Sequence, residues 1–184
     1  GGQRQRVMIA IALSTSPDLL IADEPTTALD VSIEAQILDL MRDLQENANM
    51  AIMFITHNLG VIAEIANEVV VMYMGKEVER ATTIELFENP KHPYTTALLG
   101  SIPNIGEKKG KLETIAGMVP SPFNLPSGCV FHPRCPAFMP GKCDRVNPNY
   151  AEVAEDHWAR CLLYDPCWPA TAEADAIKNQ AVAG

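Results

Sequence analysis

The chain has 184 residues, which is enough for one domain or for one domain with an appendage. Hydrophobic residues make up 47% of the sequence and charged residues 20%, a composition that indicates a folded globular protein and excludes a disordered chain. The formal net charge of -9 argues against a nucleic-acid scaffold, which usually presents a basic surface. No apolar run reaches the roughly 18 residues that a membrane-spanning helix needs. We therefore expect any association with a membrane to occur through a partner.

Helical and strand patterns alternate along the first hundred residues. The hydrophobic periodicity predicts helices over 1–16, 31–47, 58–67, 83–88 and 93–101. It predicts strands over 19–23, 50–56, 68–74 and 76–80, the last two joined by a turn at Met74 and Gly75. This alternation is typical of an α/β fold with a mostly parallel sheet covered by helices.

The most informative residues follow the first two predicted strands. Asp23 and Glu24 come directly after an apolar run, and His57 closes the next strand. In an open α/β sheet, ligands bind at the carboxyl ends of the strands. Neighbouring strand residues point to opposite sides, so the two acids can hold a metal ion and face a water molecule respectively. Asp30 lies six residues beyond Glu24 and is placed to cap the helix that follows.

The first predicted helix begins with glycines. Gly1, Gly2 and Gln3 leave backbone N–H groups and the positive end of the helix dipole facing outward. This arrangement predicts an anion site at the start of the helix.

The composition changes near residue 102. From about 103 to 148 the chain is rich in Pro and Gly and poor in long apolar patterns. This predicts a loop-rich appendage that cannot build a large core and needs a cross-link to stabilise it. We expect three parts: a first domain over 1–101, a cysteine-containing extension over 102–169 and a disordered tail over 170–184.

The five cysteines all lie in the second half of the chain. Cys129, Cys135, Cys143 and Cys161 have the spacing C-x5-C-x7-C-x17-C, and Cys167 lies outside this pattern as a predicted free thiol. An odd, clustered set suits a reducing cytosol and a metal site better than a disulfide framework.

Four thiolates can bind a [4Fe–4S] cluster or a tetrahedral Zn²⁺ ion. Zinc sites more often use closely spaced pairs, so the wide spacing favours the cluster. Two alternatives are a zinc site, for which His132 and His157 are further candidate ligands, and four unliganded thiols.

These motifs, and the order in which they occur along the chain, resemble those of the ATP-hydrolysing subunits of ABC transporters. Residues 1–6 match the end of the signature sequence, 19–24 match the Walker B strand with its catalytic glutamate, 28–30 match the D-loop, and His57 matches the switch histidine. The resemblance implies that the chain forms the C-terminal part of a P-loop, RecA-like ATPase domain, with ATP and Mg²⁺ as its ligands.

The resemblance also implies a role for each site residue. Asp23 would orient Mg²⁺ through its water shell, and Glu24 would polarise the water that attacks the γ-phosphate. His57 would contact the γ-phosphate and hold that water in line. The segment formed by Gly1, Gly2 and Gln3 would bind the γ-phosphate across a subunit interface, and Asp30 would couple the two composite sites.

The second half of the chain is similar to the C-terminal extension of peptide- and nickel-type importer ATPases. The residues that carry this similarity are 89–95, 97–99, 115–122 and the first four cysteines. It implies the ATPase subunit of a dipeptide or oligopeptide importer, with a [4Fe–4S] cluster, at the cytoplasmic face of the cell membrane. The implied partners are a second ATPase subunit, permease subunits and an extracytoplasmic solute-binding protein, with no nucleic acid.

A phosphate-binding loop of the form G-x-x-x-x-G-K-[ST] does not occur in the 184 residues. We therefore expect the chain to be the C-terminal fragment of a longer protein, and to be inactive as an ATPase by itself. Two alternatives are a soluble ABC ATPase that acts on DNA or ribosomes, and a non-catalytic regulatory module.

Overall fold

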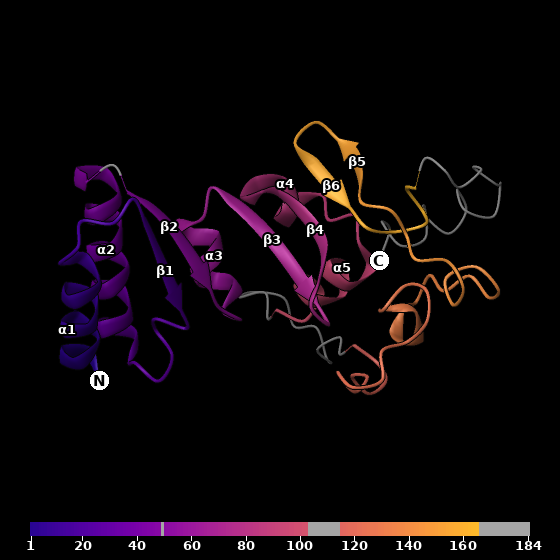
Figure 1. The fold of residues 1–184 in the computed structure, drawn as a ribbon, viewed down its shortest axis with the longest axis horizontal. Coiled ribbons are helices and arrows are strands. Elements are labelled where there is room, and N and C mark those ends of the chain that lie inside the picture. Colours follow the sequence, from indigo (N-terminus) through magenta and orange to yellow (C-terminus); the bar gives the residue numbers. More distant parts are fainter. Residues whose placement is uncertain (49, 103–114, 166–184) are drawn as a thin grey trace, which may run out of the picture. The chain divides into compact units, whose positions relative to one another are not determined.

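The structure is a computed structural model that describes residues 1–48, 50–102 and 115–165 (Figure 1). The chain divides into two compact units, Gly1–Ala66 and Asn67–Gly184, and each unit is described separately. Among the described residues, every helix is too short or too polar to cross a lipid bilayer.

The first unit is a parallel strand pair covered by helices. Its elements are α1 (Gly2–Leu13), β1 (Leu19–Asp23), α2 (Val31–Ala48), β2 (Ala51–Ile55) and α3 (Leu59–Ile65). Strands β1 and β2 run parallel, with Leu19 opposite Ala51 and Asp23 opposite Ile55. The connection between them is α2, the crossover helix that a parallel pair requires. The predicted strand over 19–23 and the predicted parallel pairing are therefore confirmed.

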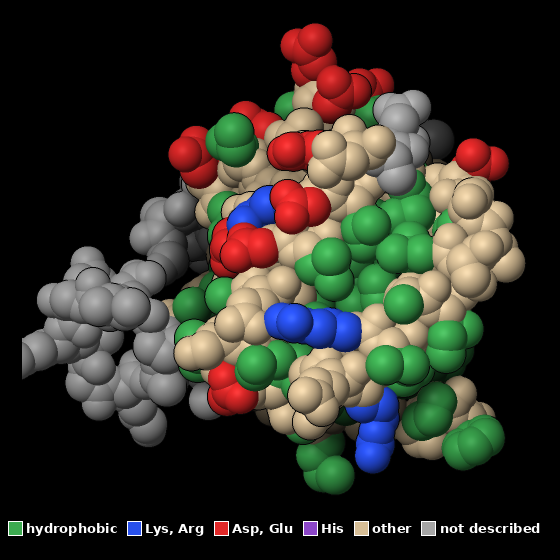
Figure 2. Space-filling view, turned by 90° about the vertical axis from the view of Figure 1, so that its left-hand side faces the viewer, with side chains coloured by type: hydrophobic (Ala, Val, Ile, Leu, Met, Phe, Trp, Pro, Cys, Tyr) green, Lys and Arg blue, Asp and Glu red, His purple; other side chains and the backbone are tan. Residues whose placement is uncertain are grey.

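One hydrophobic core joins both strands to α1 and α2. Its buried members are Ile9, Leu20, Ala22, Ile37, Met41 and Met50. Helix α1 contributes only Ile9 to the buried set, and it leaves Val7, Met8 and Ile11 exposed. Figure 2, which looks onto the side of α1 and α2, shows hydrophobic side chains gathered on this face. The unit thus buries one side of α1 and presents apolar side chains on another.

The second unit is built around an antiparallel sheet with the strand order β3-β4-β6-β5. Its elements are β3 (Glu68–Tyr73), β4 (Lys76–Thr82), α4 (Thr83–Glu88), α5 (Pro93–Gly100), the 3-10 helix η1 (His132–Arg134), β5 (Ala151–Ala154) and β6 (His157–Ala159). The predicted hairpin is confirmed, and Met74 and Gly75 form its turn at φ values of +48° and +72°. Positive φ at both central residues is the conformation that suits the twist of a tight hairpin.

The structure differs from the sequence prediction in this second sheet. A mostly parallel sheet was expected, but only β1 and β2 are parallel, and all four strands of the second sheet are antiparallel. Strands β5 and β6 were not predicted, because four and three residues are too few to show a period. The predicted boundary after residue 101 and the predicted tail over 170–184 stay predictions, since 103–114 and 166–184 lie outside the described residues.

A fully buried carboxylate connects three segments of the second unit. Glu79, on β4, accepts hydrogen bonds from the backbone N–H groups of Lys91 at 2.6 Å and His92 at 2.9 Å. Its Oε1 atom also lies 2.7 Å from Nε2 of His157 on β6, and both side chains are completely buried. A buried carboxylate needs such donors, because it has given up its hydration. Glu79 therefore holds β4, the start of α5 and β6 together.

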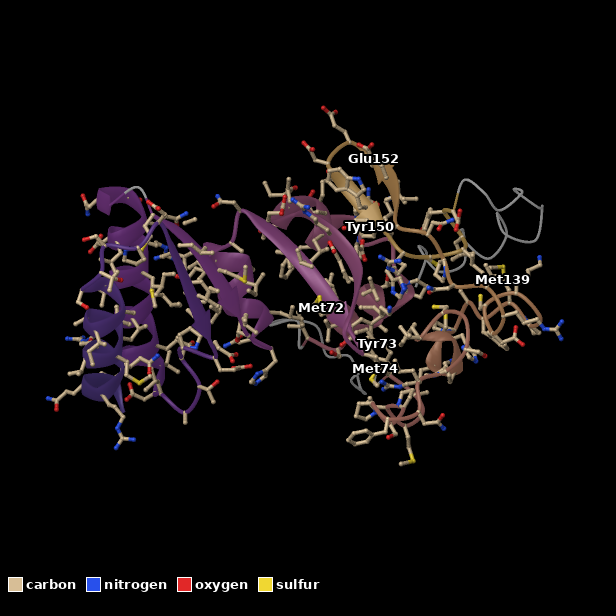
Figure 3. All side chains as sticks on the ribbon, viewed as in Figure 1. Met72, Tyr73, Met74, Met139, Tyr150 and Glu152 are labelled. Carbon is tan, nitrogen blue, oxygen red and sulfur yellow. The ribbon has the colours of Figure 1, made fainter. Side chains whose placement is uncertain are left out.

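Aromatic side chains attach the cysteine-containing segment to the hairpin and to the start of α5. Phe131 is 1% exposed, and its ring packs against those of Tyr73, Tyr94 and His92 at centroid separations of 5.2, 5.3 and 5.7 Å. Tyr73 is labelled in Figure 3, close to the turn of the hairpin. Arg134 donates to the hydroxyl of Tyr73, and also to the carbonyl groups of residues 115 and 116. This segment is thus held by specific contacts of a few side chains.

The buried carboxylate generates a stability prediction. Replacing Glu79→Ala removes the acceptor from three donors, two of them buried, and we expect a loss of about 3 kcal/mol in the free energy of unfolding. Urea denaturation measures the loss, and hydrogen exchange should show faster exchange of the Lys91 and His92 amides. Glu88→Ala, at an exposed position of α4, is the matched control. Equal stabilities of the two variants would contradict the role given to Glu79.

Candidate active site at the carboxyl ends of β1 and β2

Parallel pairing brings the ends of β1 and β2 to one edge of the first unit. The ladder continues one residue beyond β1, because the Glu24 N–H donates to the Ile55 carbonyl at 2.8 Å. Glu24 then takes a φ of +47°, which turns the chain sharply out of the strand. A non-glycine residue in this region is strained, so the surrounding contacts must hold it there. Figure 1 shows the chain's N-terminus and the loop after β1 at the same end of this unit.

The two predicted catalytic side chains are in direct contact. The Nδ1 atom of His57 lies 2.7 Å from Oε1 of Glu24, although 33 residues separate them in the sequence. The hydroxyl of Thr27 donates to the other carboxylate oxygen, Oε2, at 2.5 Å. The hydrogen bond from Thr27, and after it the one from His57, lowers the pKa of Glu24. The structure therefore holds Glu24 as a carboxylate whose side chain is 37% exposed.

Thr27 is a site residue that the sequence analysis missed. The signal available in the sequence was its position three residues after Glu24, across the turn that contains Pro25. Thr27 also donates its backbone N–H to the Glu24 carbonyl at 3.2 Å, which closes that turn. A hydroxyl at this spacing reaches back to the side chain before the turn.

Asp30 caps α2, as the sequence predicts. Its Oδ1 atom accepts from the backbone N–H of Ile33 at 3.0 Å, and its carbonyl accepts from that of Glu34 at 2.8 Å. These bonds satisfy donors of the first helical turn that have no partner within the helix. The coupling role of Asp30 stays a prediction.

The start of α1 lies against the beginning of α2. A Cβ atom added to Gly1 would meet Leu29, and one added to Gly2 would overlap the side chain of Ile33. Glycine at position 2 therefore allows close packing of the two helices, which places the first N–H groups of α1 beside the loop that follows β1. Gln3 is exposed at this end of the helix. The predicted phosphate contacts of these three residues, and the predicted Mg²⁺ contact of the exposed Asp23, stay predictions.

Four cysteines gather in one apolar cluster of the second unit. Cys143 and Cys161 are buried with Ala137, Met139, Leu162 and Leu163, and Cys129 and Cys135 pack against this set. The Cys161 thiol interacts electrostatically with each of the other three. Backbone N–H groups two residues further along the chain donate to the sulfur atoms of Cys129, Cys135 and Cys161. Such donors stabilise a thiolate.

The cysteines are not already spaced as metal ligands. Burial raises the pKa of all four thiols, that of Cys135 to about 12. Within the described ranges, no group of three or more His, Cys, Asp or Glu side chains has the arrangement of a metal site. His132 stacks on Phe138 and bonds the Cys129 carbonyl through Nδ1, while His157 binds Glu79. The iron–sulfur and zinc sites stay predictions, and Cys167 lies outside the described residues.

Two family models match the chain, one at each of the two sites described above. The family described as "ABC transporter" matches residues 1–27, and the family described as "Oligopeptide/dipeptide transporter, C-terminal region" matches residues 78–143. The first match contains Glu24, and the second contains Glu79 and the first three cysteines of the pattern.

Curated relatives extend the match over most of the chain. A Brucella ovis protein that carries the name of a peptide import ATP-binding protein is 56% identical over 170 residues, which are 89% of this chain and 50% of that protein. The oligopeptide transport ATP-binding protein AppD of Bacillus subtilis is 56% identical over 165 residues, or 90% of this chain and 50% of that protein. Among solved structures, cbiO1 from Clostridium perfringens, part of the ABC transporter complex cbiONQ, is 32% identical with a TM-score of 0.45, over 48% of this chain and 35% of that chain.

These sequence matches show that the chain belongs to the family of ABC ATP-binding proteins, and its curated relatives carry the names of peptide or oligopeptide transport proteins. The chain spans about half the length of the curated relatives it matches.

The cap of α2 gives a stability prediction. Asp30→Ala removes the side-chain acceptor of the first turn, and we expect a loss of about 1 kcal/mol in the free energy of unfolding. Asp30→Asn keeps an oxygen at the same position and should retain most of that stability. Urea denaturation of both variants provides the measurement, with Asp43→Ala on the exposed side of α2 as control. If Asp30→Asn were as unstable as Asp30→Ala, the cap would not explain the effect.

Proposed function

We propose that the complete protein is the ATP-hydrolysing, energy-coupling subunit of an ABC importer for dipeptides or oligopeptides. The observation that carries this proposal is the contact between Glu24 and His57, made at the carboxyl ends of two parallel strands in a chain of this family. The names of the relatives and the description of the matched C-terminal region support peptides as the transported solute.

The geometry suits a base that orients a water molecule. Glu24 is ionised and partly exposed, and each carboxylate oxygen has a second lone pair available for a water molecule. His57 uses Nδ1 for Glu24, and Nε2 of its exposed ring would donate to the γ-phosphate of ATP when the ring carries both protons. Positioning of this kind supplies most of the catalysis in phosphoryl transfer.

The remaining site residues would hold the nucleotide and its metal ion. Asp23 ends β1 with an exposed carboxylate, which is the type of ligand that Mg²⁺ prefers, and Mg²⁺ would neutralise charge on the phosphates. Gly1, Gly2 and Gln3 would bind the γ-phosphate held by a second ATPase subunit through the N–H groups of α1. Asp30 would couple the two sites of that dimer.

The proposed setting is the cytoplasmic face of the cell membrane. The subunit would bind permease subunits there, and an extracytoplasmic solute-binding protein would deliver the peptide. The relatives' names as import and transport ATP-binding proteins support this assembly. Purification together with a permease would support it as well, whereas purification together with nucleic acid or ribosomes would contradict it.

Glu24→Gln tests the proposed activity in the complete protein. Because the amide cannot accept the proton of the attacking water, we expect ATP hydrolysis to fall at least about a hundredfold. ATP binding and ATP-dependent dimerisation should persist, since the amide is nearly isosteric. Phosphate release and light scattering measure the two properties, and Glu46→Gln, exposed on α2, is the control. Normal turnover of Glu24→Gln would refute the assignment.

We also propose that Cys129, Cys135, Cys143 and Cys161 form a site for a [4Fe–4S] cluster. The observations that support it are the gathering of the four thiols in one apolar cluster and the backbone N–H groups aimed at three of the sulfurs. Hydrogen bonds to cysteine sulfur and low solvent exposure are the features that tune such clusters. The thiols would have to deprotonate and draw closer around the metal atoms.

Metal analysis tests the cysteine site directly. After anaerobic purification we expect about four iron and four sulfide atoms per chain, as a [4Fe–4S] cluster requires. Cys135→Ser and Cys161→Ser should lose both, and the control Cys167→Ser, outside the spacing pattern, should keep them. Finding one zinc ion per chain and no iron would favour the zinc site over the cluster. Finding neither metal would mean that the four cysteines are free thiols.

A further inference from the structure

The carboxylate of Glu24 is held from both sides by two different donors. His57 approaches Oε1 from the end of β2, and the Thr27 hydroxyl approaches Oε2 from the turn that follows β1. Two donors on the two oxygens define the plane of the carboxylate, whereas one donor alone would leave it free to rotate. The second donor comes from a residue to which neither the sequence analysis nor the proposed function gives a task.

The backbone of the turn is built to bring Thr27 to this position. Glu24 has a left-handed φ of +47°, and the Thr27 N–H bonds back to the Glu24 carbonyl. Pro25 and Thr26 are buried beneath the turn, whereas Thr27 is exposed. The strained turn therefore presents the Thr27 hydroxyl to the carboxylate while its neighbours anchor the backbone.

We propose that Thr27 is a positioning residue, whose hydroxyl holds Oε2 of Glu24 and so fixes the orientation in which this carboxylate meets the attacking water. The proposal deepens the proposed function and rests on it, because it assumes that Glu24 is the base. Thr27 acts through Glu24 and has no assigned contact with the nucleotide. Its loss should therefore reduce kcat and leave nucleotide affinity unchanged.

Two substitutions of the complete protein isolate the hydroxyl. Thr27→Val keeps the β-branched shape and removes the donor, and Thr27→Ser keeps the donor and removes the methyl group. We expect Thr27→Val to lower kcat about tenfold, the scale of one misplaced hydrogen bond, with KM for MgATP unchanged within about twofold. Thr27→Ser should recover most of the lost rate. Steady-state phosphate release gives both constants, and thermal unfolding of each variant checks that the substitution leaves the fold intact.

The possible outcomes are distinct. An unchanged or higher kcat in Thr27→Val overturns the proposal, and so does a Thr27→Ser variant that is as slow as Thr27→Val. A raised KM with a normal kcat also overturns it, because the effect would then lie in nucleotide binding. If Glu24→Gln hydrolyses ATP normally, the proposed function itself fails. An inactive Glu24→Gln with an unaffected Thr27→Val refutes only the role of Thr27.

Discussion

The parallel register of β1 and β2 is the constraint on which the candidate active site depends. Because Asp23 lies opposite Ile55, the hydrogen-bond ladder between β1 and β2 extends by one more bond, from the Glu24 N–H. Both strands therefore end at the same edge of the sheet. Glu24 and His57 can therefore touch across 33 residues of sequence. A register shifted by one residue would turn the side chains of one strand to the opposite face and separate the two groups.

The second unit is held together by different means. Its cysteine-containing segment has few long apolar patterns, so it depends on a small number of specific interactions. Glu79 ties β4 to β6 and to the start of α5, and Phe131 inserts among aromatic rings at the hairpin. Buried polar contacts of this kind are stabilising where donors and acceptors are paired, as they are at the Glu79 carboxylate, although the buried Nδ1 atom of His157 has no hydrogen-bond partner among the described residues. This explains how a loop-rich segment can hold a defined position without a large core.

Elements whose sequence pattern is long, or lies in neighbouring residues, could be predicted from the sequence, whereas short elements and contacts between distant residues could not. The strand over 19–23, the hairpin and the cap at Asp30 depend on neighbouring residues, and the structure agrees with all three. Strands β5 and β6 are too short to show a pattern, and they exist because β4 offers a free edge. Thr27 and Glu79 were missed for a related reason, since an isolated hydroxyl or carboxylate in a sequence does not identify its partner.

The sequence by itself determined the chemistry available at the site: two acids after an apolar strand, a histidine after the next, and four cysteines in the second half. It also determined the family, through the order of these motifs. Only the tertiary structure decided that Glu24 takes one hydrogen bond on each oxygen, and that Glu79 is buried against His157. The physical reason is that hydrogen bonding and burial depend on distances between segments, which local patterns of residues do not specify.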